Sequence, residues 1–412
     1  MIVHSYYEED QRVRRQAEAL VRAGRPVDVF SLRRRSDQPG GVVEGVAVNR
    51  IDVRRHQGAG LPVYLAEYVA FLVRAGWAVT AAHRRRRYAL LQVHSLPDFL
   101  AFAGLPLRVA GIPMLLDLHE AMPEFFRVRF ARASNPLVHL LLELQERASI
   151  GLANRVLTVN EPLGERLVRL GVPRRKVGVV RNAPSLERFD PSHQPARSFA
   201  EDGAVRLVYA GALSPVYELD VVFRAIARLR RERPDILISF DVYGRDYGET
   251  QWPRLAAELG LAPEVTFHGR IPIDDMPAAL ARADIGLAPT RQSRFTDLSL
   301  STKLLEYAAM GKPVIASALP LVVATFGDRV LTYRPGDEAD LAAAIVRTVD
   351  DAAAREDRVR EAAALAAEFG AERETARYLE IVEGLALDGV SSGRPPPADR
   401  SRPPGRYDVE DG

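Results

Sequence analysis

The chain has 412 residues, of which 47% are hydrophobic and 27% charged, and its formal net charge is +2. This is the composition of a soluble globular protein, and the length favours two domains over a single hydrophobic core. The near-neutral charge gives no reason to expect nucleic acid as a partner. The absence of cysteine excludes disulfides and thiolate catalysis, and the 8 histidines lack the spacing of a zinc motif, so we expect no metal site.

Short apolar runs alternate with helical segments through the first half of the chain. The start Met1-Ile2-Val3 leads directly into a polar loop, so we expect no signal peptide and a short first strand. Helices are expected at 12–23 and 137–153. The expected strands are 27–31, 89–94, 113–118, 155–159 and 177–180. This alternation predicts a parallel sheet with helices on both faces.

The segment Leu61–Ala82 is largely apolar and is followed by His83 and four arginines, Arg84–Arg87. Glu67 and Arg74 argue against a helix that spans a membrane. Two interpretations remain. One is an amphipathic domain helix whose basic end is solvated. The other is a peripheral surface, residues 61–87, that rests on anionic lipid with Trp77 and the arginines at the level of the headgroups.

The second half repeats the alternation after a polar, proline-containing segment, 184–203, which we interpret as a linker. Helices are expected at 219–232, 252–259 and 338–350, with a last helical stretch over 353–387. The expected strands are 205–209, 236–243, 265–268, 285–288 and 314–316. From residue 389 the chain is rich in Pro, Arg, Ser and Gly without apolar periodicity, which predicts a disordered tail over 389–412.

Residues 301–314 read STKLLEYAAMGKPV, a helix start at Ser301 or Thr302 that ends near a glycine. Lys303 and Glu306 lie three residues apart and therefore share one face of the helix. The helix N-terminus offers free N–H groups to an anion, Lys303 adds a charge, and Glu306 can accept hydrogen bonds from sugar hydroxyls. Two of the chain's three lysines lie here. This predicts a binding site for a sugar diphosphate; the alternative is an ordinary amphipathic helix with a solvated Lys and Glu.

This segment resembles the donor-binding helix of the family 4 retaining glycosyltransferases, in the variant S-x-K-L-x-E-Y-x-A-x-G-K-P-V. Further segments resemble the same family in the same order: 6–12, 92–98, 117–124, 208–213, 267–271 and 283–289. The resemblance implies the α/β fold called GT-B, with two Rossmann-like doubly wound domains that face a central cleft. It also implies the division of the chain: an acceptor-side domain at 1–183, the linker at 184–203, a nucleotide-sugar domain at 204–369 and a crossover helix at 370–388.

The resemblance also implies roles for individual residues. His119 would face the donor sugar from the first domain, and Glu306 would hold the ribose. The phosphates would be met by the backbone at Gly211 and by Ser301, Thr302 and Lys303, with Arg245 as a second candidate cation. The segment Arg270-Ile271 would lie near the nucleotide base. We thus expect His119, Lys303 and Glu306 to be the catalytic residues.

The chain departs from the family pattern at two places. Relatives often carry an Arg/Lys pair after the turn at 211, but residues 214–220 read SPVYELD and hold no cation. Relatives also carry an acid that touches the donor sugar eight positions before Glu306, where this chain has Leu298; Asp297 is adjacent.

The sequence therefore favours a glycosyltransferase that moves a sugar from a nucleotide-diphosphate donor to a hydroxyl acceptor with retention of configuration. Family context implies an acceptor in polysaccharide or glycolipid assembly, either a saccharide or a lipid-linked one. It also implies a cytoplasmic enzyme, and the segment 61–87 allows a peripheral position on the inner face of the membrane. We expect neither a cofactor nor a metal, because the nucleotide sugar is a substrate. Two alternatives stay open: a degenerate donor-binding partner protein, and a nucleotide-sugar epimerase or hydrolase on the same fold. The base, the sugar, the acceptor and the oligomeric state are not determined.

Overall fold

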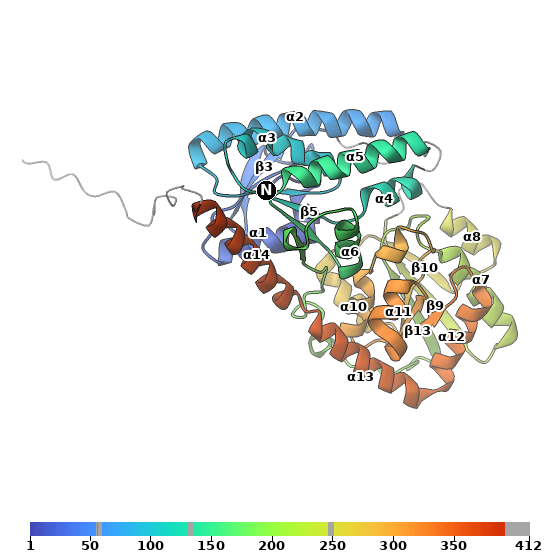
Figure 1. The fold of residues 1–412 in the computed structure, drawn as a ribbon. Helices are drawn as coiled ribbons and strands as arrows, with labels where there is room; N and C mark the ends of the chain where they lie inside the picture. Colours follow the sequence, from blue (N-terminus) through green and yellow to red (C-terminus); the bar gives the residue numbers. More distant parts are fainter. Residues whose placement is uncertain (55, 57–59, 131–134, 246–250, 392–412) are drawn as a thin grey trace, which may run out of the picture.

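The computed structural model of the chain consists of two α/β halves, each built on its own sheet (Figure 1). It describes all residues except 55, 57–59, 131–134, 246–250 and 392–412. The predicted α/β class with two doubly wound sheets is confirmed.

The N-terminal sheet consists of two groups of strands joined by Ile2. In the first group β1 (Asp28–Leu32) pairs in parallel with β3 (Val46–Ile51), and β2 (Gly40–Val43) pairs antiparallel with β3. The second group is parallel, in the order β4 (Leu91–His94), β5 (Met114–Leu118), β6 (Arg155–Thr158) and β7 (Val177–Val179). Ile2 forms parallel bridges to Phe30 and Val93, so the expected first strand is present but short. Residues that follow β4 and β5 therefore emerge at the same edge of the sheet.

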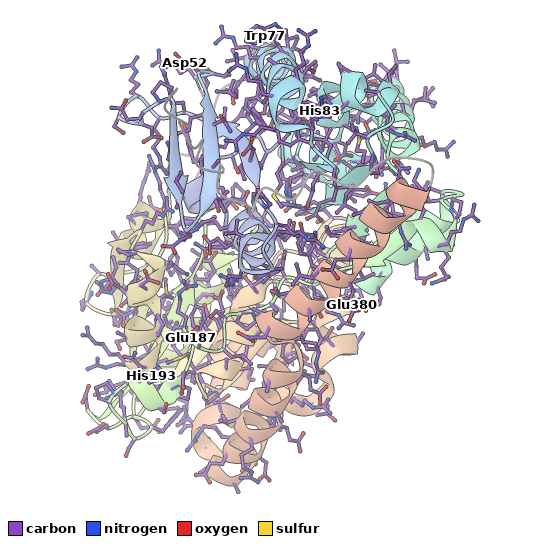
Figure 2. The ribbon with its side chains drawn as sticks, turned by 90° about the vertical axis from the view of Figure 1, so that its left-hand side faces the viewer. Asp52, Trp77, His83, Glu187, His193 and Glu380 are labelled. Carbon is purple, nitrogen blue, oxygen red and sulfur yellow. The ribbon has the colours of Figure 1, made fainter. Side chains whose placement is uncertain are left out.

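Helices cover both faces of the N-terminal sheet. One face carries α2 (Leu61–Arg86), α3 (Leu105–Val109), α5 (Pro136–Leu152) and the 3-10 helix Asp98–Gly104, which bury Phe71, Leu107 and Ile150. The other face carries α1 (Gln11–Arg22) and α14 (Ala371–Ser391), which bury Val13 and Tyr378. The last helix of the chain thus packs on the first half (Figures 1 and 2). The loops that follow β5 and β6 lead into α4 (Met122–Arg129) and α6 (Glu161–Arg169), respectively.

The C-terminal sheet has six parallel strands in the order β10-β9-β8-β11-β12-β13. Their bounds are β8 (Ala204–Ala210), β9 (Leu237–Tyr243), β10 (Val265–Gly269), β11 (Ile285–Ala288), β12 (Val314–Ser317) and β13 (Leu331–Tyr333). Numbered along the chain, this is the 3-2-1-4-5-6 order of a dinucleotide-binding fold. The order reverses between β8 and β11, and ligands of such sheets bind beyond the carboxyl ends of the strands at that point.

Two groups of helices enclose this second sheet. One face is covered by α7 (Leu219–Glu232), α8 (Trp252–Glu258) and α12 (Glu338–Asp350). The opposite face is covered by α9 (Met276–Ala281), α10 (Thr302–Ala309), α11 (Pro320–Phe326) and α13 (Ala352–Glu368). The helix α10 lies within the predicted segment 301–314, and it packs Leu304, Leu305 and Tyr307 into the core.

The structure contains elements that were not expected from the sequence, among them the short helices α4, α6, α9 and α11. The hairpin β2–β3 and the short strand β13 were not predicted, because each is short and only half-buried, without a clear apolar run. The single helical stretch expected over 353–387 is two helices that break at Phe369-Gly370. The expected tail begins at 389, but residues 389–391 belong to α14, and the remainder lies outside the described residues.

Candidate functional site

The carboxyl ends of β8 and β9 approach each other closely at two glycines. A Cβ atom built on Gly211 would lie 2.7 Å from the Lys303 amine and 3.0 Å from the Tyr209 hydroxyl oxygen. A Cβ on Gly244 would collide with the Gly211 carbonyl oxygen. Only glycine fits at either position, and the bare backbone of Gly211 lies beside the Lys303 amine, where a ligand can approach it.

Lys303 lies in the first turn of α10 and is 5% exposed. Its ammonium lies 4.1 Å from the centre of the Tyr209 ring and 3.9 Å from that of Tyr217. Within the described residues the Nζ atom has no hydrogen-bond partner. Burial lowers the pKa of Lys303 to about 7, and the charge of Glu306 opposes the shift only in part. A buried ammonium with no acceptor favours the binding of an anion.

Glu306 follows on the same face of α10, one turn later. Burial raises the pKa of this carboxyl to about 7, against the opposing charges of Lys303 and Arg188. Tyr307 fixes the helix to the sheet, because its hydroxyl accepts a hydrogen bond of 2.8 Å from the Ala210 backbone N–H. Ser301 and Thr302 begin the helix, and the Ser301 side chain does not cap its N–H groups. The structure thus places Gly211, Lys303 and the N-terminus of α10 together, and their role in donor binding stays a prediction.

The N-terminal half contributes a buried charged group at the end of β5. The Asp117 carboxylate accepts from the Arg12 guanidinium at 2.6 and 3.0 Å and from the Gln16 amide at 2.8 Å. The His94 Nδ1 atom lies 3.4 Å from this carboxylate and 3.3 Å from the His119 Nε2 atom. Burial alone would raise the pKa of Asp117, but Arg12 and the two imidazoles hold it well below its usual range. His119, which is partly exposed, is therefore oriented by a fixed carboxylate.

The trio His94, Asp117 and His119 also has the spacing of a metal site, since its ligand atoms lie within 4.8 Å of one another. The Arg12 guanidinium, however, binds both oxygens of Asp117. A cation placed there would face a carboxylate that is already neutralised. The donor set therefore suits the orientation of an imidazole better than the binding of an ion.

Two further titratable residues, Glu120 and Tyr217, lie in the segments that follow β5 and β8. Glu120 follows His119, and burial raises the pKa of its carboxyl to about 7. Tyr217, which covers Lys303, has a raised pKa because of burial and the nearby charge of Glu120. Neither residue was singled out from the sequence. Glu120 lies within the recognised segment 117–124, and Tyr217 within the segment noted for its lack of a cation. Each could have been found as a polar residue that follows a strand end.

The other residues predicted to bind the donor, Arg245, Arg270 and Ile271, contact other parts of the protein in this structure. The Arg270 guanidinium, after β10, lies 3.0 Å from the carboxylate of Glu9 in the N-terminal half. Ile271 packs against the core under α10. Arg245 is exposed after β9, and its carbonyl accepts from the Leu213 N–H at 3.2 Å. The roles of these residues and of His119 in binding stay predictions.

Two further contacts join the N-terminal half to the C-terminal half near α10; we call this region the junction. The Asn160 amide donates to the carbonyl oxygen of Leu298 at 2.8 Å, and the rings of Phe125 and Phe295 meet edge to face at 5.6 Å. These contacts hold the loop before α10 against the segments that follow β5 and β6.

Comparison with known families identifies both halves of the chain. Residues 10–183 match the glycosyl transferase 4-like domain, and residues 204–351 match the glycosyl transferases group 1. The chain belongs to the group 1 glycosyltransferases of family 4. Its fold is GT-B, and it is a glycosyltransferase that uses a nucleotide sugar.

Individual relatives agree with this family assignment. A D-inositol 3-phosphate glycosyltransferase of Arthrobacter sp. (strain FB24) is 26% identical over 400 residues, which cover 93% of this chain and 91% of the relative. Sucrose-phosphate synthase from Thermosynechococcus elongatus has a similar structure, with a TM-score of 0.73 at 19% identity over 92% of this chain and 93% of that one. Anabaena HepE in complex with UDP-glucose has a TM-score of 0.67 at 15% identity, over 93% of this glycosyltransferase and 98% of that chain.

Proposed function

We propose that this glycosyltransferase holds the diphosphate of its donor at Lys303, Gly211 and the N-terminus of α10, and transfers the sugar with retention of configuration. The observation that carries the proposal is the Lys303 ammonium, buried between two tyrosine rings beside Gly211 without a hydrogen-bond acceptor among the described residues. The leaving diphosphate gains negative charge as the glycosidic bond breaks, and a positioned cation stabilises that charge. Lys303 would thus replace the cations that are missing from 214–220.

The other residues have supporting roles in this proposal. Glu306 would accept hydrogen bonds from the ribose hydroxyls, and His119 would face the transferred sugar from the N-terminal half. Approach of the two halves would exclude water and so suppress hydrolysis of the donor. We propose no metal and no cofactor; the nucleotide sugar is the substrate. The proposed domains are 1–183 and 204–369, joined by the linker 184–203 and by the crossover helix 370–388.

The first test is thermal stabilisation of the purified protein by UDP, GDP, ADP and dTDP. A ligand at 100 times its dissociation constant adds about 2.7 kcal/mol to the free energy of unfolding, which shifts the melting temperature by several degrees. We expect one of the four to give this shift. If none of them stabilises the protein, the proposed donor site is wrong.

Glu306→Ala should weaken binding of that nucleotide about 10- to 100-fold, because a hydrogen bond to a charged acceptor contributes about 1.5–3 kcal/mol. The binding is measured by titration calorimetry. The exposed Glu232, which forms an i,i+4 pair with Arg228, supplies the control Glu232→Ala, for which we expect unchanged affinity. Equal affinity of Glu306→Ala and the native protein would remove Glu306 from the site.

We further propose a saccharide or lipid-linked acceptor and peripheral attachment to the inner face of the cytoplasmic membrane through residues 61–87. Within the described part of the chain, α2 is the one helix whose length and composition would allow it to cross a membrane. One stripe of α2 is buried in the core, at Glu67, Phe71, Ala75 and Val79. The opposite stripe is exposed, at Leu65, Val69, Val73 and Trp77, with Trp77 at 77%. Trp77 lies at the outer edge of the N-terminal half (Figure 2).

A second apolar stripe supports this attachment. On α5, which runs over the same side of the N-terminal half in Figure 1, Leu137, Leu140, Leu141 and Leu144 are all exposed. Exposed apolar side chains on a helix whose C-terminal end carries the exposed Arg84–Arg87 have the chemistry of a surface that inserts shallowly into an anionic leaflet. A membrane-bound enzyme would meet a lipid-linked acceptor at this surface.

Sedimentation with phosphatidylcholine vesicles, with and without phosphatidylglycerol, tests this attachment. Binding is expected only with the anionic lipid, and Arg84→Ala/Arg85→Ala should weaken it by about tenfold or more, since each basic residue near the surface contributes about 1 kcal/mol. Trp77→Ser should weaken it too, whereas Leu237→Ser, at an exposed leucine of the other half, should not. Lack of binding to anionic vesicles would leave a soluble saccharide as the acceptor.

A further inference from the structure

We propose that Glu120 holds a hydroxyl group of the transferred sugar and is thereby a determinant of donor specificity. The inference rests on the function proposed above, in which Lys303 binds the diphosphate. It adds an acceptor of hydrogen bonds on the opposite side of the junction between the halves.

The position of Glu120 is the first observation. It follows His119 directly after β5, at the edge of the sheet from which Asn160, after β6, reaches Leu298 of the C-terminal half. Its Oε2 atom is buried and has no hydrogen-bond partner within the described residues. A buried carboxylate oxygen without a donor is costly, and a ligand hydroxyl placed there would remove that cost.

The surroundings of Glu120 indicate which ligand fits. The charge of Glu120 acts on Tyr217, and the Tyr217 ring lies 3.9 Å from the Lys303 ammonium. Within the described residues, the Lys303 ammonium and the Glu120 Oε2 atom are both buried without a hydrogen-bond partner. A ligand that satisfies both must carry an anionic group adjacent to hydroxyl donors. In a nucleotide sugar, the diphosphate and the sugar ring have this arrangement.

The other carboxylates near the junction are excluded by their contacts. Asp117 is occupied by Arg12 and Gln16. Asp98 is completely buried in the 3-10 helix Asp98–Gly104, which packs on α2 and α5. Asp297, next to Leu298, accepts from the Gln292 amide at 3.2 Å. Within the described residues, Glu120 is the carboxylate that directly follows His119 and has a buried oxygen without a partner.

The test compares a nucleoside diphosphate with its sugar conjugate in two matched variants, Glu120→Gln and Asp297→Asn. The diphosphate is the one that stabilises the native protein. The conjugate is whichever of UDP-glucose, UDP-galactose, UDP-N-acetylglucosamine, GDP-mannose, ADP-glucose and dTDP-glucose binds most tightly. The quantity measured is the ratio of the two dissociation constants, conjugate over diphosphate.

For Glu120→Gln we expect this ratio to rise about tenfold or more while the affinity for the diphosphate alone stays within about twofold, since only a hydrogen bond to the sugar is lost. For Asp297→Asn we expect no change in the ratio. If the ratio rises equally in Glu120→Ala, the effect does not come from the amide group introduced in Glu120→Gln.

Three results would overturn the proposal. The ratio could stay unchanged in both Glu120 variants. It could change in Asp297→Asn instead, which would identify Asp297 as the sugar ligand. Both affinities could fall together with the melting temperature, which would indicate a purely structural role. Failure of the native protein to bind any nucleotide is a separate result, which would refute the proposed donor site and this inference with it.

Discussion

Replacing Lys303 by Met is expected to lower kcat about 100- to 1,000-fold, which is the usual cost of removing one group that stabilises a developing negative charge. The same change should raise the melting temperature by about 2–4 °C, because it removes an ammonium that is buried without a hydrogen-bond acceptor among the described residues. Methionine has nearly the same length and fits between the two tyrosine rings. Transfer assays and thermal unfolding measure the two effects.

The gain in stability expected for Lys303→Met should also depend on pH. The pKa of Lys303 is about 7 in the folded protein and 10.5 in the unfolded chain. Between these values the unfolded chain binds the extra proton, so native stability rises with pH in this window. The advantage of Lys303→Met should therefore be largest below pH 7 and disappear as the pH approaches 10.5.

Lys312→Met is the matched control for Lys303→Met. The Lys312 ammonium donates to the carbonyl oxygen of Ala281 at 2.8 Å and lies at the far end of the same segment. Its replacement should leave kcat unchanged. A Lys303→Met enzyme with native activity would show that the diphosphate is neutralised elsewhere.

Arg12→Ala is expected to lower the free energy of unfolding by about 3–5 kcal/mol, because the buried Asp117 carboxylate would lose its counter-ion. Arg12 also donates to the carbonyl oxygen of Val180 and to Asn182, both at 2.9 Å, so the change loosens the entry to the linker as well. Urea unfolding measures the loss. Arg14→Ala on the same helix removes only an i,i+4 pair with Glu18 at 2.9 Å and should cost about 0.5 kcal/mol or less.

The pH dependence of the stability loss in Arg12→Ala should show that this loss comes from the unpaired Asp117 carboxylate. In the native protein the pKa of Asp117 is held well below its usual range, so its contribution is present above the unfolded value of 3.8 and is lost as the pH falls through the folded value. Without Arg12 the buried carboxyl can protonate, and the deficit of Arg12→Ala should shrink in acid. The double variant Arg12→Ala/Asp117→Asn should recover part of the lost stability at neutral pH. A deficit that is independent of pH and is not reduced in the double variant would contradict this account.

Several elements followed from local patterns in the sequence. The helix α7 and the strand β11 have the predicted bounds, because amphipathic and fully apolar runs are strong signals. Asp10, a residue type that favours the N-cap position, caps α1, with its carboxylate accepting from the Val13 N–H at 3.2 Å. In the same way, the spacing of Lys303 and Glu306 alone placed both residues on one face of α10.

Contacts between distant residues could not be predicted in this way. Arg270 was expected near the nucleotide base, yet its guanidinium pairs with Glu9, 261 residues earlier. Arg12 and Asp117 lie 105 residues apart, and each alone had the pattern of an ordinary polar residue at the end of an element. Tyr378 donates to Gln92, 286 residues earlier, at 2.6 Å, and no local pattern predicts its partner.

The sequence by itself determined the two doubly wound sheets, the polar residues at the strand ends and the helix that begins at Ser301, since each depends on neighbours within a few residues. Only the tertiary structure decided that Lys303 is buried between Tyr209 and Tyr217, that Arg12 neutralises Asp117, and that the Glu120 Oε2 atom is buried without a partner among the described residues. Burial and charge pairing depend on which distant segments meet. These two quantities set the pKa values and the unpartnered groups from which the site is built.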